Sequence, residues 1–433
     1  MKFKNMLKTV VSTAIVMSIG ATTLPLSVSA ELSESAEPYA STKYYNSCDI
    51  DRNGKVEIMD VVLFNRCLVG ADYISDYKQL DADTNGIINF ADSYCISSCL
   101  VNASYTCSVD GLGSYKNQTI SDTPSPISAP TSAEYVKYDY EIQETSEYTL
   151  SMPEEYNAEN AISTYAGVIG DDDREYMTDQ PEFSGIVQIV LRKKTSPNGA
   201  TGAIAYSTGF IVGDHQIATA AHCVYGAYTE EKGKYHFYSH TTTSKNEIYL
   251  YDKDGNKTGE KLTPVEVHIP SDFIAKYPQA CAENDIHPIV YCDYALITVE
   301  EDLSKYTHFN IGLTKDPYSS AFSNANIYVS GLPRIVNSDR NTDWKIAKGC
   351  GKMYTGSKLY PDKVLYYTTD VTEGDSGAPI YTITKYKAGN TEYYDYTAIG
   401  IVSGGDNAST FNFGVRMIPL IQRFYNSNPN FSY

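Results

Sequence analysis

Short apolar runs separated by turn-forming residues fill the second half of the chain. From residue 186 to the end, runs rich in valine, isoleucine and tyrosine alternate with glycine, proline, asparagine and aspartate. The clearest runs are Ile186–Leu191, Ile248–Tyr251, Ile327–Val329, Val364–Thr369 and Thr397–Val402. Many short strands with turns between them are typical of all-β proteins, so residues 181–433 are predicted to form a pair of β barrels.

Two longer apolar stretches, Ile58–Val69 and Phe90–Val101, lie nearer the N-terminus and predict helices. Each follows a loop rich in aspartate, asparagine and glycine, and the loops begin 81 − 49 = 32 residues apart. Oxygen ligands at loop positions 1, 3, 5 and 12, with glycine at 6 and a backbone carbonyl at 7, wrap a calcium ion. The residues at these ligand positions are Asp49, Asp51, Asn53, Lys55 and Asp60 in the first loop, and Asp81, Asp83, Asn85, Ile87 and Asp92 in the second. Such residues also make ordinary turns, but the repeat of the whole pattern favours two calcium ions.

The first thirty residues have the features of a secretory signal peptide. Lysines at positions 2, 4 and 8 precede an apolar stretch over residues 10–21, and Val28-Ser29-Ala30 offers a small-residue cleavage site. The apolar stretch is too short to span a membrane, and no later segment is longer. An exported, extracellular protein is therefore predicted, with residues 1–30 removed.

The net charge and the cysteine content limit the binding partners, disulfides and metal ions that can be expected. A net charge of −19 makes nucleic acid and anionic membranes unsuitable partners and is compatible with calcium binding. Nine cysteines in an exported chain permit disulfides, and the odd number leaves at least one without a partner in the same chain. Cys95 and Cys99 lack the further ligands of a zinc site, so calcium is the one predicted ion, and none is expected in catalysis.

Residues 108–180 show no regular periodicity. Thr119–Ser132 is rich in serine, threonine and proline, which predicts a semi-extended linker. Residues 133–180 are acidic and carry several tyrosines. A propeptide, a belt wrapped around the following domain and further linker are all compatible with this stretch.

Three motifs carry candidate chemistry. Ser376 lies in Glu373-Gly374-Asp375-Ser376-Gly377, His222 follows a strand-like run, and Asp293 opens the apolar run 294–299. A serine hydroxyl attacks a carbonyl only when a base takes its proton and donors stabilise the oxyanion. His222 is the candidate base and Asp293 its orienting partner, while the N–H groups of Gly374 and Ser376 are the candidate oxyanion hole.

This order of His, Asp and Ser resembles the chymotrypsin-like proteases, more closely their bacterial secreted branch, which includes the glutamyl endopeptidases. The resemblance covers roughly residues 181–430. It implies two six-stranded barrels, peptide-bond hydrolysis, a C-terminal helix near Met417–Phe424 and a substrate-binding edge at Ser403-Gly404-Gly405. The separation of 293 − 222 = 71 residues is long for this family and predicts an insertion over 227–285, with a hairpin turn at 252–255. An inert adaptor with a protease fold and an esterase or acyl transferase are the alternatives.

The duplicated loop–helix units, with aspartate at position 12 of both loops, resemble a dockerin over about residues 45–107. The resemblance implies attachment to a cohesin module on a scaffold of the cellulosome type, a setting of polysaccharide catabolism. The implied cohesin contacts are Ile58, Met59, Phe90 and Ala91. Because the two halves differ, one binding orientation is expected to dominate. Cys48 and Cys107 flank the module and are candidates to clasp its ends.

Two aspartates bear on specificity and activation. Asp370 lies where trypsin-like enzymes carry the aspartate that binds Arg or Lys, but a structural role is the alternative. Val402 stands where the glutamyl endopeptidases use histidine, which argues against glutamate specificity, and Gly404 and Gly405 leave the pocket mouth open. Asp375 matches the residue that pairs with a newly cut N-terminal amine in trypsin zymogens. No basic residue immediately precedes Ile186, so Asp375 is expected to find a partner inside the chain, with processing removing residues 133–180.

Overall fold

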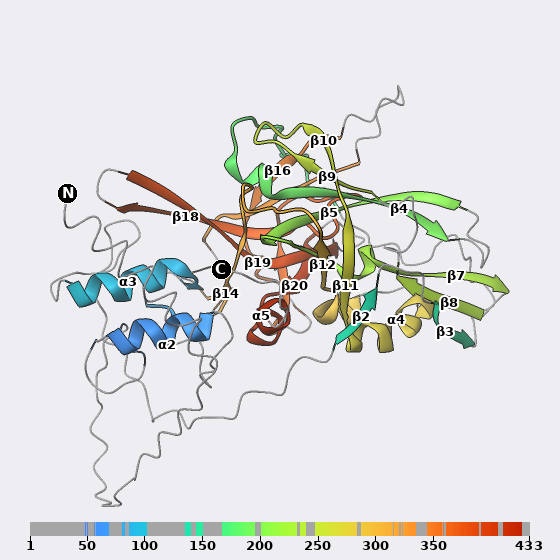
Figure 1. The fold of residues 1–433 in the computed structure, drawn as a ribbon, viewed down its shortest axis with the longest axis horizontal. Coiled ribbons are helices and arrows are strands. Elements are labelled where there is room, and N and C mark those ends of the chain that lie inside the picture. Colours follow the sequence, from blue (N-terminus) through green and yellow to red (C-terminus); the bar gives the residue numbers. More distant parts are fainter. Residues whose placement is uncertain are drawn as a thin grey trace, which may run out of the picture. The chain divides into compact units, whose positions relative to one another are not determined.

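The computed structural model describes two compact units, Met1–Pro130 with Lys385–Tyr393, and Thr131–Thr384 with Tyr394–Tyr433 (Figure 1). The described residues are 48, 50, 56, 58–68, 80–82, 86–101, 135–139, 144–149, 167–194, 201–231, 234–239, 247–283, 287–314, 316–319, 322, 324–334, 344–356, 358, 361–388, 391–405 and 410–426. No helix among them is long and apolar enough to cross a membrane.

The first unit contains helices α2 (Ile58–Leu68) and α3 (Phe90–Val101) and the short strand β1 (Ile87–Ile88). Both helices were predicted, and α2 ends one residue before the expected Val69. Apolar side chains such as Phe64 and Ile96 are fully buried, because each helix turns one apolar face inward.

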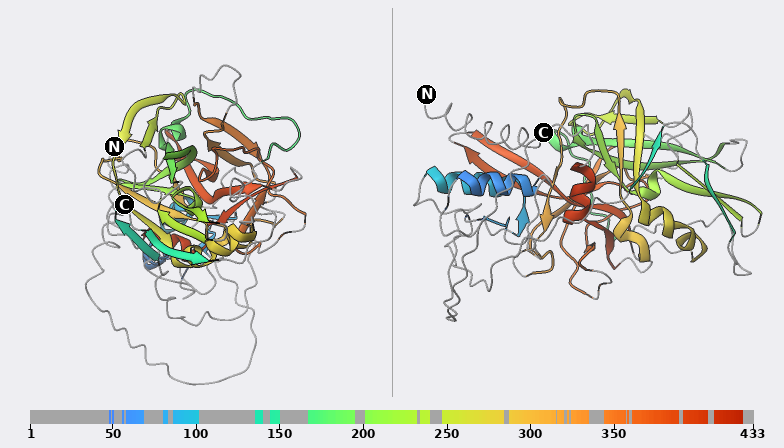
Figure 2. Two further views of the ribbon diagram at one scale, coloured as in Figure 1. Left: turned by 90° about the vertical axis from the view of Figure 1, so that its right-hand side faces the viewer. Right: turned by 60° about the horizontal axis from the view of Figure 1, so that its bottom comes forward.

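The second unit is built on two curled antiparallel sheets (Figures 1 and 2). The first has eight strands in the order β10 (Lys257–Leu262), β9 (Glu247–Tyr251), β4 (Ile186–Lys194), β5 (Thr201–Gly213), β6 (Gln216–Thr219), β12 (Ala295–Val299), β11 (Pro264–Pro270) and β2 (Tyr135–Asp139). The second has β16 (Ala347–Gly351), β15 (Ile327–Gly331), β18 (Pro379–Ala388), β19 (Thr391–Gly405), β20 (Asn412–Arg416) and β17 (Val364–Tyr367), with β13 (Asn310–Ile311) parallel to β19. Every residue of β12, β17 and β20 is buried, and β12 and β17 accordingly show no alternation of apolar and polar residues.

The sheets are larger than the predicted six-stranded barrels, and the acidic stretch before residue 181 is one reason. Its strand β2 pairs with β11 and forms one edge of the first sheet. Its strand β3 (Glu144–Thr149) pairs with β8 (Lys234–Ser239), which pairs in turn with β7 (Tyr225–Glu231). These pairings argue against further linker, while a belt and a propeptide both stay compatible with residues 133–180, which are called the belt below. The compact unit begins before residue 181.

The predicted insertion carries β7 to β11 and helix α4 (Ser271–Glu283). The expected hairpin turn joins β9 to β10: Asp252 N–H donates to the carbonyl of Asn256 at 2.9 Å, and Gly255 has φ of 72°. A positive φ is the conformation that glycine adopts without strain. The remaining elements are the turns η4 (Pro181–Gly185), η5 (Ala221–Cys223) and η7 (His287–Cys292), the strand β14 (Leu313–Thr314) and the C-terminal helix α5 (Pro419–Asn426). Helix α5 confirms the predicted helix, with a start two residues later.

Candidate active site

The pairing of β6 with β12 brings His222 and Asp293 to the same end of the first sheet. Thr219 lies opposite Ala295, and the chains are antiparallel. The residues just after β6 and just before β12 must therefore meet. His222 Nδ1 lies 2.7 Å from Asp293 Oδ2, and His222 N–H donates to Asp293 Oδ1 at 2.9 Å.

The charge of Asp293 determines the pKa and the tautomer of the His222 imidazole. Burial disfavours the charged imidazolium, but the adjacent Asp293 carboxylate and the Cys223 sulfur outweigh it, so the pKa of His222 lies well above its ordinary value. Because Asp293 accepts at Nδ1, neutral His222 carries its proton there and leaves Nε2 as the acceptor. This is the tautomer that a base acting on a serine hydroxyl needs.

Two left-handed glycines shape the loop around Ser376. Gly374 has φ of 102° and Gly377 φ of 85°. A Cβ atom on Gly377 would lie 2.2 Å from both the Thr208 carbonyl oxygen and Thr219 Oγ1, and 3.1 Å from the backbone nitrogen of Ala220. The loop therefore lies against the segment that leads into His222, and no residue but glycine fits there.

The oxyanion donors are held by a neighbouring peptide. The carbonyl of Glu373 accepts from Arg334 N–H at 2.7 Å. In a trans peptide the next N–H points to the opposite side, which turns the Gly374 N–H away from Arg334. Among the described residues, neither Gly374 N–H nor Ser376 N–H donates to another group. Both amides fit the predicted oxyanion hole, which needs donors not engaged elsewhere.

His222 and Ser376 are not hydrogen-bonded to each other within the described part of the chain. His222 Nε2 makes a contact with Cys223 Sγ at 3.7 Å. Catalytic hydrogen bonds of this kind often tighten only when substrate is bound. The side chain of Ser376 lies in a nearly buried site, with 8% of the residue exposed.

Residues 207–386 match a trypsin-like peptidase domain. The matched residues include His222, Asp293 and Ser376, and the match supports a trypsin-like serine peptidase in the second unit. Among solved structures, a Glu endopeptidase in complex with MPD is 19% identical with a TM-score of 0.41, covering 60% of this chain and 99% of that chain. The Rv3671c protease from M. tuberculosis in its active form is 15% identical with a TM-score of 0.31, covering 57% of this chain and 81% of that chain. Among curated proteins, none matches the sequence.

The carboxylate of Asp370 is hydrogen-bonded to the belt and is not free in a pocket. Its two carboxylate oxygens accept from the N–H groups of Ile169 at 2.7 Å and Asp173 at 3.1 Å, and the residue is 3% exposed. Burial raises the pKa of Asp370, which these two backbone donors oppose. The structural alternative for Asp370 is favoured, and the expectation of a free carboxylate for Arg or Lys is corrected. The sequence did not show this because the partners are about 200 residues away (370 − 169 = 201).

The predicted substrate edge lies beside the nucleophile loop. The carbonyl of Val402 accepts from Gly377 N–H, and its N–H donates to the Ala378 carbonyl, both at 2.9 Å. Val402 and Ser403 are fully buried, and the register of β19 with β20 shifts between Val402 and Gly404. This shift changes the direction of β19 at the position of the residues predicted to contact substrate.

Thr208 on β5 is a further part of the candidate site that the sequence did not indicate. Its N–H donates to the Ser376 carbonyl at 2.9 Å, and its buried hydroxyl donates to the Gly374 carbonyl at 2.8 Å. The same hydroxyl accepts from Leu332 N–H at 3.1 Å. One side chain thus ties the nucleophile loop to both sheets.

We expect Thr208→Val to lower kcat/KM on a peptide substrate about tenfold and to destabilise the domain by about 1–3 kcal/mol. The valine leaves the Gly374 carbonyl and the Leu332 N–H buried without their partner. Thr208→Ser keeps the hydroxyl and is the matched control. Steady-state kinetics and urea unfolding measure the two effects, and unchanged kinetics in the valine variant would contradict the assignment.

The described parts of the two calcium loops hold buried carboxylates. Asp60 and Asp92 are fully buried and Asp81 is 5% exposed. Ile50 N–H donates to Asp60 at 2.6 Å, Asn89 N–H donates to Asp92 at 2.9 Å, and Gly86 N–H donates to Asp81 at 3.1 Å. Gly86 has φ of 88°, as expected for the glycine at loop position 6. Buried carboxylates need a compensating charge, so these side chains suit a hard cation.

Of the other predicted calcium ligands, Ile87 lies in β1. The remaining ones lie outside the described residues: Asp49, Asp51, Asn53, Lys55, Asp83 and Asn85. Of the predicted cohesin contacts, Ile58 and Met59 are exposed (48% and 53%). Ala91 is buried, and its N–H donates to Asn89, so Ala91 is not available to a partner.

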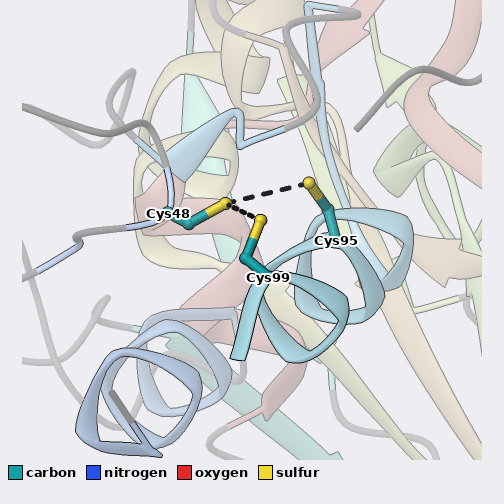
Figure 3. Close-up of side chains that lie close together, drawn as sticks. All are labelled: Cys48, Cys95 and Cys99. Carbon is teal, nitrogen blue, oxygen red and sulfur yellow. Dashed lines mark hydrogen bonds between the residues drawn. The ribbon is translucent and has the colours of Figure 1, made fainter. Parts of the chain in front are cut away.

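Three cysteines gather beside α3 (Figure 3). Cys48 Sγ lies 3.0 Å from Cys99 Sγ and 3.9 Å from Cys95 Sγ. Cys95 is disulfide-bonded, so its sulfur is not a thiolate that could bind a metal ion. Cys107 lies outside the described residues. The contacts of Cys48 with Cys95 and Cys99 do not support its predicted disulfide with Cys107.

Proposed function

We propose that the second unit is a serine endopeptidase that cuts protein chains outside the cell. The hydrogen-bonded pair of His222 and Asp293, beside a glycine-flanked Ser376, carries this proposal. Ser376 Oγ attacks the scissile carbonyl carbon while its proton passes to His222 Nε2. The oxyanion is stabilised by the N–H groups of Gly374 and Ser376.

The intermediate collapses when the carbon–nitrogen bond breaks and His222 returns the proton to the leaving amine. A water molecule then attacks the acyl carbon and gives a proton to His222. The bond from the acyl carbon to Ser376 Oγ breaks, His222 returns that proton to Oγ, and the new carboxylic acid leaves and ionises. Asp293 holds the tautomer and stabilises the imidazolium throughout. Val402 and residues 403–405 would bind the substrate backbone and the side chain of the residue that precedes the scissile bond. Because Asp370 is engaged by the belt, we propose no preference for Arg or Lys.

A fluorophosphonate probe on the full chain tests the proposal. The probe should label Ser376, and the protein should cleave a casein-like substrate. No labelling would favour an inert adaptor. Labelling with cleavage of esters but not peptides would favour an esterase or acyl transferase. A peptide-library cleavage profile then gives the residue preferred before the scissile bond.

We further propose that the first unit is a dockerin that binds two calcium ions and a cohesin, which would keep the exported enzyme on a scaffold. The buried carboxylates of Asp60, Asp81 and Asp92 support the calcium ions. The exposed Ile58 and Met59 support an apolar contact with the partner. The belt and the Ser/Thr/Pro-rich stretch would then connect an anchoring module to a catalytic one.

We expect removal of calcium to unfold α2 and α3 and to leave the sheets intact, since the loop carboxylates would repel one another without the ion. Hydrogen exchange of the full chain, with and without a chelator, measures this by segment. Asp60→Asn and Asp92→Asn should reproduce the loss in one loop each. Helix protection that is indifferent to the chelator would contradict the calcium assignment.

A further inference from the structure

A short segment of the belt, residues 167–175 (the strap), holds the loop that carries the candidate nucleophile. Gly167 exchanges two hydrogen bonds with the side chain of Asn412 on β20, at 3.1 and 2.9 Å. Glu175 forms an isolated antiparallel bridge with Lys348 on β16. Between these anchors the strap reaches Asp370 and Asp375, on both sides of the turn that leads to Ser376.

Arg174 makes the central contact of the strap. Its Nη1 donates to Asp375 Oδ2 at 3.0 Å and to Thr372 Oγ1 at 2.9 Å. Its Nε and Nη2 donate to both oxygens of Asp172, at 2.8 and 2.7 Å. The Asp172 fork fixes the plane of the guanidinium. The Arg174 and Asp375 side chains are 9% and 3% exposed, so this is a buried ion pair.

Asp375 shapes the nucleophile loop from inside. Its Oδ2 accepts from Thr372 N–H at 2.8 Å, and its own N–H donates to the Thr372 carbonyl at 3.0 Å. These bonds close the turn one residue before Ser376. Burial raises the pKa of Asp375 to about 6, and Arg174 opposes the rise, so at neutral pH the carboxylate is ionised and paired.

We propose that Arg174 is a positioning residue for catalysis: through Asp375 it keeps the Thr372–Ser376 turn in the shape that points the Gly374 and Ser376 N–H groups at one oxyanion. The strap thereby supplies, within an uncut chain, the positive charge that a free N-terminal amine would otherwise bring to Asp375. The inference rests on the proposed peptidase function. It corrects the expectation that processing removes residues up to 180, because the strap must remain.

The surroundings of Ile186 agree with this. Ile186 is fully buried, its N–H donates to the Phe183 carbonyl, and its Cα lies opposite Phe210 on β5. The chain on both sides of the Gly185–Ile186 bond is thus built into the fold. A new N-terminus at Ile186 would have to leave the first sheet before it could pair with Asp375.

A buried ion pair can also serve stability alone, and the kinetic pattern separates the two roles. In the full chain, Arg174→Met should lower kcat about 10²-fold, with KM changed less than threefold, because oxyanion stabilisation acts on the transition state. Arg174→Lys keeps the charge and should recover part of kcat. Lys253→Met is the matched control, since it breaks an exposed ion pair with Asp179 just beyond the strap; its kinetics should equal those of the wild type.

A double-mutant cycle shows whether Arg174 acts through Asp375. In an Asp375→Asn background, Arg174→Met should lower kcat by less than threefold further. If Arg174→Met unfolds below the assay temperature, Arg174→Lys decides the question, both alone and in place of Arg174→Met in the cycle. The proposal is overturned by wild-type kcat in Arg174→Met, by full additivity in the cycle, or by active enzyme whose N-terminus is Ile186. If the fluorophosphonate does not label the wild-type chain, the proposed peptidase function is wrong, and the inference on Arg174 is wrong with it.

Discussion

Replacing Ser376 by alanine is expected to lower the rate of peptide hydrolysis on the order of 10⁴-fold or more, because no other group at the site can form the acyl intermediate. The fold should change little. The described contacts of Ser376 to the rest of the protein run through its backbone carbonyl, which alanine keeps. A small loss of activity would show that Ser376 is not the nucleophile.

The measurement is cleavage of a casein-like substrate by full-length protein, with thermal unfolding recorded in parallel. Ser319→Ala removes a hydroxyl that caps a turn at Asp316 and is the matched control, with unchanged activity. Residual hydrolysis in Ser376→Ala should resist the fluorophosphonate probe. Retention of most of the wild-type rate would rule out the assignment of this motif, whatever the probe labels.

Local patterns were sufficient where the structure is local. The helices that follow the acidic loops and the hairpin turn at Asp252–Gly255 lie where apolar periodicity and turn residues predicted them. The five clearest apolar runs overlap with β4, β9, β15, β17 and β19. The pairing of His222 with Asp293 also agrees with the motifs, because each residue lies at the end of a buried strand that the sequence shows clearly. The helices, the turn and the strands depend on residues a few positions apart, so a single sequence records them. The pairing of His222 with Asp293 joins residues 71 positions apart and was implied by the family resemblance.

The contacts made by the belt could not be predicted in this way. Strand β2 is an edge strand joined by backbone hydrogen bonds, which need no apolar pattern in the strand that is added. Arg174 follows three aspartates, which on sequence grounds marks an exposed, solvated segment. Its pairing with Asp375, 201 residues away, depends on how the second sheet places β16 and the turn that leads to Ser376. Asp370 was a candidate for specificity for the same reason, since its partners lie in a segment that carried no signal of its own.

Asp293→Asn is expected to lower kcat about 10⁴-fold and to move the acid side of the pH–rate profile to lower pH. An asparagine Nδ2 would donate to His222 Nδ1, which would force the imidazole proton onto Nε2 and leave no acceptor for the serine proton. The Asp293 charge stabilises the imidazolium, so its loss lowers the pKa of His222. In the wild type the reactive neutral imidazole forms only as the pH rises through that raised pKa.

The pH dependence of kcat/KM in both proteins measures the shift, and the rate ratio at the pH optimum measures the loss. Asp252→Asn is a suitable control, because one oxygen of Asp252 accepts from both Asp254 N–H and Asn256 N–H, and asparagine keeps an oxygen for them. A loss of rate with an unmoved acid limb would mean that Asp293 orients the ring but does not set the pKa of His222. A wild-type rate in Asp293→Asn would show that catalysis does not depend on the Asp293 carboxylate, and would contradict its assignment as the partner of His222.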